Sequence, residues 1–61
     1  MDDWSIANAA ESLVGLFGHD APENAALDIA EGYGGDEGDA EEVWERYNKL
    51  VAIEQRLGIE R

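Results

Sequence analysis

The sequence predicts an all-α fold, a small three-helix bundle, and three observations support this prediction. Apolar residues recur at spacings of three and four in three separate segments, as they do along the buried side of a helix. Each segment starts near an Asp that can cap a helix, and a glycine follows each segment. Sixty-one residues suffice for one domain, residues 1–61, near the lower size limit for a single hydrophobic core.

The first helix is predicted over about residues 3–17. Asp2 or Asp3 caps its N-terminus, because a carboxylate there accepts a bond from a free backbone N–H group. Gly18 follows as a residue that takes a positive φ at little cost. The stripe that we expect to be buried is Ile6, Ala10, Leu13 and Phe17, with Ala7 and Val14 beside it.

The second helix is predicted over about residues 21–31. Asp20 acts as its cap, Pro22 lies in the first turn, and Glu23 takes the capping-box position. The inward stripe is rich in alanine and should bury little area: Ala25, Ala26, Ile29 and Ala30, extended by Tyr33. The outward side is acidic and includes one aliphatic residue: Asp20, Glu23, Asn24, Asp28 and Glu31, with Leu27 among them.

Residues 32–38 are predicted to be a flexible acidic loop, because they contain four glycines. The third helix is predicted over about residues 39–57, with Asp39 as cap and Gly58 as its stop. Two favourable pairs of opposite charge four residues apart support it: Glu42 with Arg46, and Glu45 with Lys49. Its apolar stripe is Val43, Trp44, Tyr47, Leu50, Val51 and Leu57.

Glu54 falls in the middle of that apolar stripe. An unpaired buried carboxylate is costly, so Glu54 needs a hydrogen-bond donor or an exposed position. One interpretation is that the bundle frays there or that a Tyr, indole or Arg satisfies the carboxylate. The other is an internal polar latch in which Trp4 or His19 donates to Glu54.

The distribution of charge is uneven along the chain. The formal net charge is −11, and residues 1–45 carry thirteen Asp or Glu with no Lys or Arg. Residues 46–61 carry four bases and two acids, so the two parts contribute −13 and +2. A phosphate backbone and an anionic membrane surface would both repel such a chain. We therefore expect no direct binding of nucleic acid or membrane.

The absence of cysteine leaves no disulfide framework and no thiolate metal site. The start of the sequence has no basic segment ahead of an apolar run, and no apolar run is long enough to span a bilayer. We expect a cytoplasmic protein, in the host cytoplasm if a phage encodes it.

Catalysis is not expected from this sequence. His19 is the single histidine, and its place between Gly18 and Asp20 favours solvent exposure or helix capping over chemistry. The acidic loop does not have the EF-hand spacing, which requires alternating acids, a central Gly and a final Glu. We therefore expect neither a metal ion nor a cofactor.

The chain resembles a group of short acidic helical proteins of unknown function from alphaproteobacteria and their phages. The resemblance covers most of the chain. It implies a helical fold and brings no activity with it. The residues that carry it are Leu13, Gly18, Asp20 and Ala21, then Gly38–Asp39, Val43–Trp44 and Ala52–Ile53–Glu54.

The leading hypothesis is a non-catalytic inhibitor or adaptor that docks an acidic face on a basic surface of another protein. Carboxylates three or four residues apart on a helix lie about 5 to 6 Å from one another, which roughly matches successive phosphates of a strand. The target is then a nucleic-acid-binding protein, and the chain a nucleic-acid mimic such as a phage anti-CRISPR protein. The predicted binding residues are Asp20, Glu23, Asp28, Glu31, Asp36, Glu37, Asp39, Glu41, Glu42 and Glu45, with Trp4 and Leu27 as exposed anchors.

The alternative hypothesis is a regulatory or structural helical module. It homodimerises or packs the apolar surface of its third helix, including Trp44 and Val51, on a partner. The acidity would then serve solubility alone. Binding by the mimic should weaken steeply with salt, whereas binding by the apolar module should hardly respond.

Overall fold

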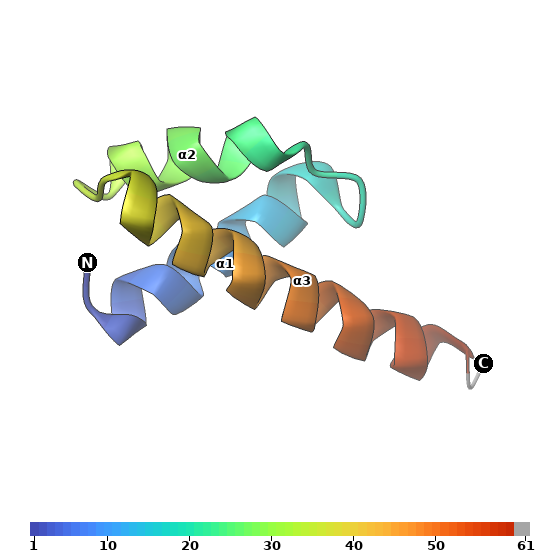
Figure 1. Cartoon of the computed structure of the whole chain (residues 1–61). Coiled ribbons are helices and arrows are strands. Elements are labelled where there is room, and N and C mark those ends of the chain that lie inside the picture. Colours follow the sequence, from blue (N-terminus) through green and yellow to red (C-terminus); the bar gives the residue numbers. More distant parts are fainter. Residues whose placement is uncertain (60–61) are drawn as a thin grey trace.

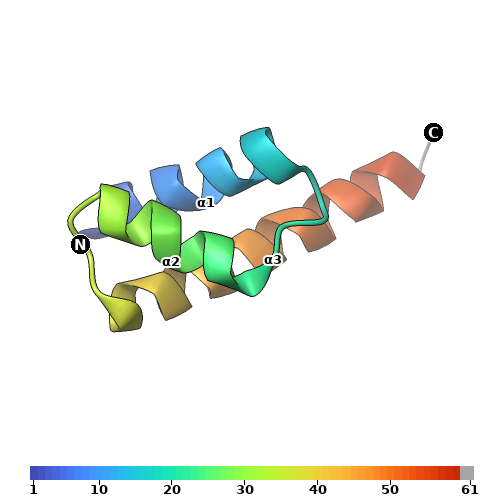
Figure 2. The same ribbon diagram turned by 90° about the horizontal axis from the view of Figure 1, so that it is seen from above.

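The computed structural model describes residues 1–59 of the chain, and the side chains of residues 1–57. This part forms a bundle of three helices: α1 (Asp3–Phe17), α2 (Glu23–Gly32) and α3 (Glu37–Ile59). The helices run in alternating directions, and α1 and α2 both pack on the N-terminal part of α3 (Figures 1 and 2). The predicted all-α, three-helix fold is confirmed.

The start and end of α1 agree with the sequence prediction. Asp2 is the N-cap, and its carboxylate accepts a hydrogen bond of 2.8 Å from the Ser5 backbone N–H. This bond lowers the pKa of Asp2, because it stabilises the ionised form. Gly18 ends the helix at φ 64°, and its N–H donates to the carbonyl oxygen of Val14.

The predicted start of α2 is wrong by two residues. The helix begins at Glu23, with Pro22 in extended conformation as its N-cap, so Asp20 does not cap it. The backbone N–H of Ala21 donates instead to the hydroxyl oxygen of Tyr47 at 3.1 Å. This contact holds residue 21 in the connection between the helices.

The predicted boundaries of α3 and of the glycine loop are also wrong. The helix begins at Glu37 and includes Gly38, because Asp36 occupies the capping position predicted for Asp39. The Asp39 N–H donates to the Asp36 side chain, and the Asp36 N–H donates to the Asp39 side chain, each at 3.1 Å. The loop is therefore confined to residues 33–36, and the helix passes Gly58 to reach Ile59.

The core is small and rich in alanine. Its ten buried hydrophobic residues come from all three helices, and six of them are alanine: Ile6, Ala9, Ala10, Leu13, Ala25, Ala26, Ala30, Ala40, Val43 and Tyr47. Short side chains let the helices approach closely but bury little area. Phe17 and Tyr33 were expected in this core and are 43% and 42% exposed. Each lies at the end of its helix, where no following turn covers it.

The C-terminal part of α3 extends beyond the other two helices (Figures 1 and 2). At 1.5 Å per residue, 23 residues give α3 a length of about 35 Å, against about 22 Å for the 15 residues of α1. Leu57 was expected in the buried stripe and is 62% exposed, because it lies in this overhang. Neither of the predicted Glu–base pairs on α3 comes within 4.0 Å among the described residues.

Glu54 is half-exposed at the base of this overhang. Its Oε1 lies 2.9 Å from the Nε2 of His19, so His19 is the partner that one hypothesis named. The pair is not internal, since both side chains are partly exposed, at 36% and 46%. Trp4, the other named partner, lies 71% exposed on the first turn of α1.

Candidate protein-docking groove

A groove of about 500 Å³ lies between α2 and the first half of α3. Its floor is apolar and most of its rim is acidic. One bound partner could therefore make apolar contacts with the floor and ion pairs with the rim. We call it the acidic groove. It is lined by Glu23, Asn24, Ala26 and Leu27 from α2, and by Glu37, Ala40, Glu41, Trp44 and Glu45 from α3.

Two half-buried side chains provide the larger apolar surfaces of the groove. Leu27 and Trp44 both pack against the buried core while still lining the groove. The Trp44 ring stacks on the Tyr47 ring, with centroids 5.3 Å apart and planes 20° from parallel. Tyr47 is itself fixed, because its hydroxyl donates to the Gly18 carbonyl oxygen at 2.8 Å and accepts from the Ala21 N–H. The indole therefore has rigid support.

The acidic rim comes mainly from one row on α3. Glu37, Glu41 and Glu45 follow one another at intervals of four residues and are all exposed. Like charges at this spacing destabilise a helix by a few tenths of a kcal/mol per pair. Glu23 adds a fourth carboxylate from α2. A cationic occupant would relieve this repulsion, whereas an anionic one would increase it.

Five of the twelve predicted binding residues line the acidic groove. Leu27 is the anchor that the sequence placed among outward acids, but it is half-buried and turned toward the core. Trp4 and four of the predicted acids are exposed outside the groove, so the structure does not gather all twelve in one site. The five in the groove are Glu23, Leu27, Glu37, Glu41 and Glu45; the four acids outside it are Asp20, Asp28, Glu31 and Glu42.

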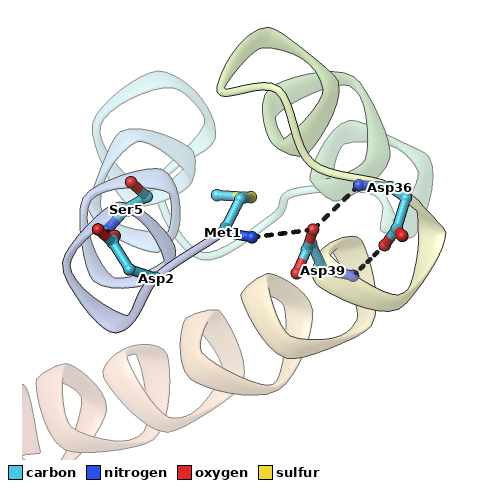
Figure 3. Close-up of polar contacts among 5 residues, drawn as sticks. All are labelled: Met1, Asp2, Ser5, Asp36 and Asp39. Carbon is cyan, nitrogen blue, oxygen red and sulfur yellow. Dashed lines mark hydrogen bonds and ion pairs between the residues drawn. The ribbon is translucent and has the colours of Figure 1, made fainter.

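The remaining two predicted acids, Asp36 and Asp39, are engaged at the start of α3. The Asp39 carboxylate accepts from the Asp36 N–H and lies 3.3 Å from the N-terminal ammonium group of Met1 (Figure 3). The Asp36 bond, followed by the ammonium group, lowers the pKa of Asp39. Asp39 is thus already paired and serves the fold.

The binding prediction missed four groove residues, of which Trp44 has the largest side chain; the others are Asn24, Ala26 and Ala40. Trp44 was assigned to the apolar surface of the alternative hypothesis, although it lies on the same side of α3 as the acidic row. The pattern Glu37, Glu41 and Glu45 with Trp44 beside it is visible in the sequence and could have identified this side. The contribution of α2 to the groove could not be seen, because it depends on how the two helices pack.

A second, shallower hollow of about 320 Å³ lies between α1 and α2, lined by Ser12, Leu16, Ile29, Gly32 and Tyr33. It contains no charged side chain and therefore offers no electrostatic selection. Within residues 1–59, no group of three or more His, Cys, Asp or Glu side chains is arranged to hold a metal ion.

No family model, curated protein or solved structure matches this chain. The resemblance to short acidic helical proteins therefore stays a prediction. In the described part of the chain, none of the helices has the length and apolar character needed to cross a membrane.

Proposed function

We propose that this chain is a non-catalytic inhibitor or adaptor that docks its acidic face on a basic surface of another protein. The observation that supports the proposal is the acidic groove, in which four carboxylates surround the apolar surfaces of Leu27 and Trp44. Cations of the partner would pair with the rim while an aliphatic or aromatic side chain fills the floor. The exposed acids outside the groove would speed the encounter through long-range attraction.

The preferred partner is a cytoplasmic nucleic-acid-binding protein whose basic site the chain occupies as a nucleic-acid mimic. The row of Glu37, Glu41 and Glu45 supports this choice, because the Cβ atoms of residues four apart on a helix lie about 5 to 6 Å from one another. An inhibitor of a nuclease system, of the kind that phage anti-CRISPR proteins form, is the particular class that we propose. Its support is the small size and the net charge of −11.

The test uses two triple variants of equal net charge. Glu37→Gln/Glu41→Gln/Glu45→Gln removes the acidic row, and Glu11→Gln/Asp28→Asn/Glu31→Gln removes three acids that do not line the groove. Each raises the net charge from −11 to −8, that is, −11 + 3. The wild-type chain first captures its partner from bacterial lysate at low salt, and mass spectrometry identifies the eluted protein.

The captured protein is then bound to fluorescent duplex DNA and titrated with each variant. Wild type should displace the DNA, the row variant should lose roughly tenfold or more in apparent affinity, and the control should lose much less. Equal losses in both variants would show that net charge alone acts and that the groove has no role. Failure of the wild type to displace DNA would reject the mimic.

The alternative, an apolar docking module, has its own supporting observation. Ile53 and Leu57 are 52% and 62% exposed on the overhanging end of α3. Such a module should retain its partner between low and high salt, whereas the mimic should lose affinity steeply through slower association.

A further inference from the structure

A second exposed surface runs along the C-terminal part of α3 and combines basic with apolar side chains. At 100° per residue, its five members fall within an arc of about 100° around the helix. All five are exposed. We call this surface the basic strip, and it consists of Arg46, Lys49, Ile53, Arg56 and Leu57.

Glu42 and Glu45 lie one helical turn before Arg46 and Lys49, but the bases of the basic strip form no ion pair within 4.0 Å with another described residue. The ion pairs within 4.0 Å in the described part of the chain are Met1–Asp39 and His19–Glu54. No described carboxylate therefore lies that close to the three bases of the strip. The last turns of α3, which carry the C-terminal end of the strip, extend beyond α1 and α2 (Figures 1 and 2).

The basic strip and the acidic groove complement each other in charge and shape. The groove offers an apolar floor bordered by carboxylates, and the strip offers Ile53 and Leu57 bordered by cations. The lengths also agree. Lys49 and Arg56 are about 10 Å apart along the helix axis, and Glu37 and Glu45 about 12 Å.

The strip cannot reach the groove of its own molecule, because both belong to one continuous helix. Their centres lie about 125° apart around α3, and Ile53 is about 18 Å from Glu41 along the axis. Only a strip from another molecule can enter the groove.

We propose that the basic strip of one copy docks in the acidic groove of a second copy, head to tail. The inference rests on the same groove as the proposed function. In this arrangement each contact joins the strip of one copy to the groove of the next, so a pair held by one contact keeps one strip and one groove unfilled. A free strip and a free groove remain at the two ends of each assembly. Larger assemblies therefore form as the protein concentration rises. A second copy and a basic partner compete for one site.

The net charge of −11 per copy opposes this assembly at long range. At about 0.15 M salt the Debye length is about 8 Å, so the long-range repulsion is screened while contacts at ion-pair distance persist. Assembly should therefore be stronger at about 0.15 M salt than at about 0.01 M.

Sedimentation velocity of the full chain from about 10 µM to about 1 mM, at about 0.15 M salt, tests the inference. The groove variant is Glu37→Gln/Glu41→Gln/Glu45→Gln, and the strip variant is Lys49→Gln/Ile53→Ser/Arg56→Gln. Every substituted side chain is exposed, and circular dichroism verifies that each variant remains helical. The matched control is Glu11→Gln/Asp28→Asn/Glu31→Gln, which shares the net charge of the groove variant.

The average mass of the wild type should rise past that of two copies, and the control should follow it. Each variant alone should stay at the mass of one copy. An equal mixture should form pairs and nothing larger, because one variant supplies the intact strip and the other the intact groove. A wild type that stays monomeric, a wild type that stops at two copies, or a variant that assembles like the wild type would each overturn the inference.

The DNA-displacement assay separates this inference from the proposed function. The strip variant keeps its groove, so it should still displace DNA from the captured partner. A monomeric wild type that displaces DNA would reject head-to-tail assembly alone. A wild type that assembles but displaces no DNA would reject the proposed function alone.

Discussion

The hydroxyl group of Tyr47 on α3 donates a hydrogen bond of 2.8 Å to the carbonyl oxygen of Gly18 at the end of α1. The Tyr47 hydroxyl oxygen also accepts a hydrogen bond from the Ala21 N–H at 3.1 Å, and Tyr47 is 2% exposed. One buried side chain thus joins the connection between α1 and α2 to the helix that carries most of the groove.

Tyr47→Phe should lower the free energy of unfolding by about 1 to 3 kcal/mol. The change retains a ring against Trp44 but leaves the Gly18 carbonyl and the Ala21 N–H without their partner. Urea unfolding followed by circular dichroism measures the loss. Tyr33→Phe is the control, since Tyr33 is 42% exposed and should change stability by less than about 0.5 kcal/mol. Equal effects would contradict the role given to Tyr47.

Gly35→Ala should destabilise the fold, whereas Gly15→Ala should stabilise it. A Cβ at residue 35 would lie 2.9 Å from the Asp39 Cβ and would also meet the Met1 side chain. At Gly15, an exposed position within α1, a Cβ meets nothing within 4 Å. Alanine there should add up to about 1 kcal/mol through helix propensity. Thermal melting compares the two variants. A rise in melting temperature for Gly35→Ala would show that the loop accommodates a Cβ at residue 35 without strain.

Asp39→Asn should lower stability at neutral pH and have progressively less effect as the solution is acidified. The pKa of Asp39 in the folded chain is below the ordinary value of 3.8, so the folded state binds fewer protons than the unfolded state. Its contribution is fully present above that ordinary value and is lost as the pH falls through the lower, folded pKa. Unfolding curves from about pH 7 to about pH 2 measure the difference. Asp28→Asn removes one charge at an exposed acid outside this cluster and serves as the control; equal behaviour of the two variants would refute the pairing.

Occupation of the acidic groove should change the fluorescence of Trp44 and leave that of Trp4 unchanged. Trp44 lines the groove, whereas Trp4 is 71% exposed on α1. With Trp4→Phe, the emission reports Trp44 and should shift to shorter wavelength when the captured partner binds, because the ring loses water contact. With Trp44→Phe, the remaining emission should not shift. If only the emission of Trp4 shifts when the partner binds, the docking site lies on α1 and not in the groove.

The helices and much of the core were predictable because their signals are local. The spacing of Ile6, Ala10 and Leu13 identifies a buried side without knowledge of what covers it, and Gly18 marks an end by its own conformational freedom. The start of α2 was not predictable in the same way. Pro22 disfavours a helical conformation at Ala21, and the Ala21 N–H bonds to Tyr47, which is 26 residues away in the sequence.

Errors in the expected buried stripes arise from the unequal lengths of the helices. Leu57 has the right spacing for a core residue, but α1 and α2 end before they could cover it. The acidic groove was predictable only in part for a related reason. The sequence shows its carboxylates, but the position of Leu27 beside Trp44 follows from how α2 packs on α3.

The predominance of alanine in the core has a consequence for the thermodynamics of unfolding. Six of the ten buried hydrophobic residues are alanine, so melting exposes little apolar area to water. The heat-capacity increment of unfolding should therefore fall below the usual 12 to 15 cal/mol/K per residue, since that increment follows the newly hydrated apolar surface. The stability curve should be shallow in temperature, and calorimetry should record a broad transition of small enthalpy. A partner bound in the groove would increase the apolar area that unfolding exposes. The thermal transition of the complex should therefore be narrower than that of the free chain.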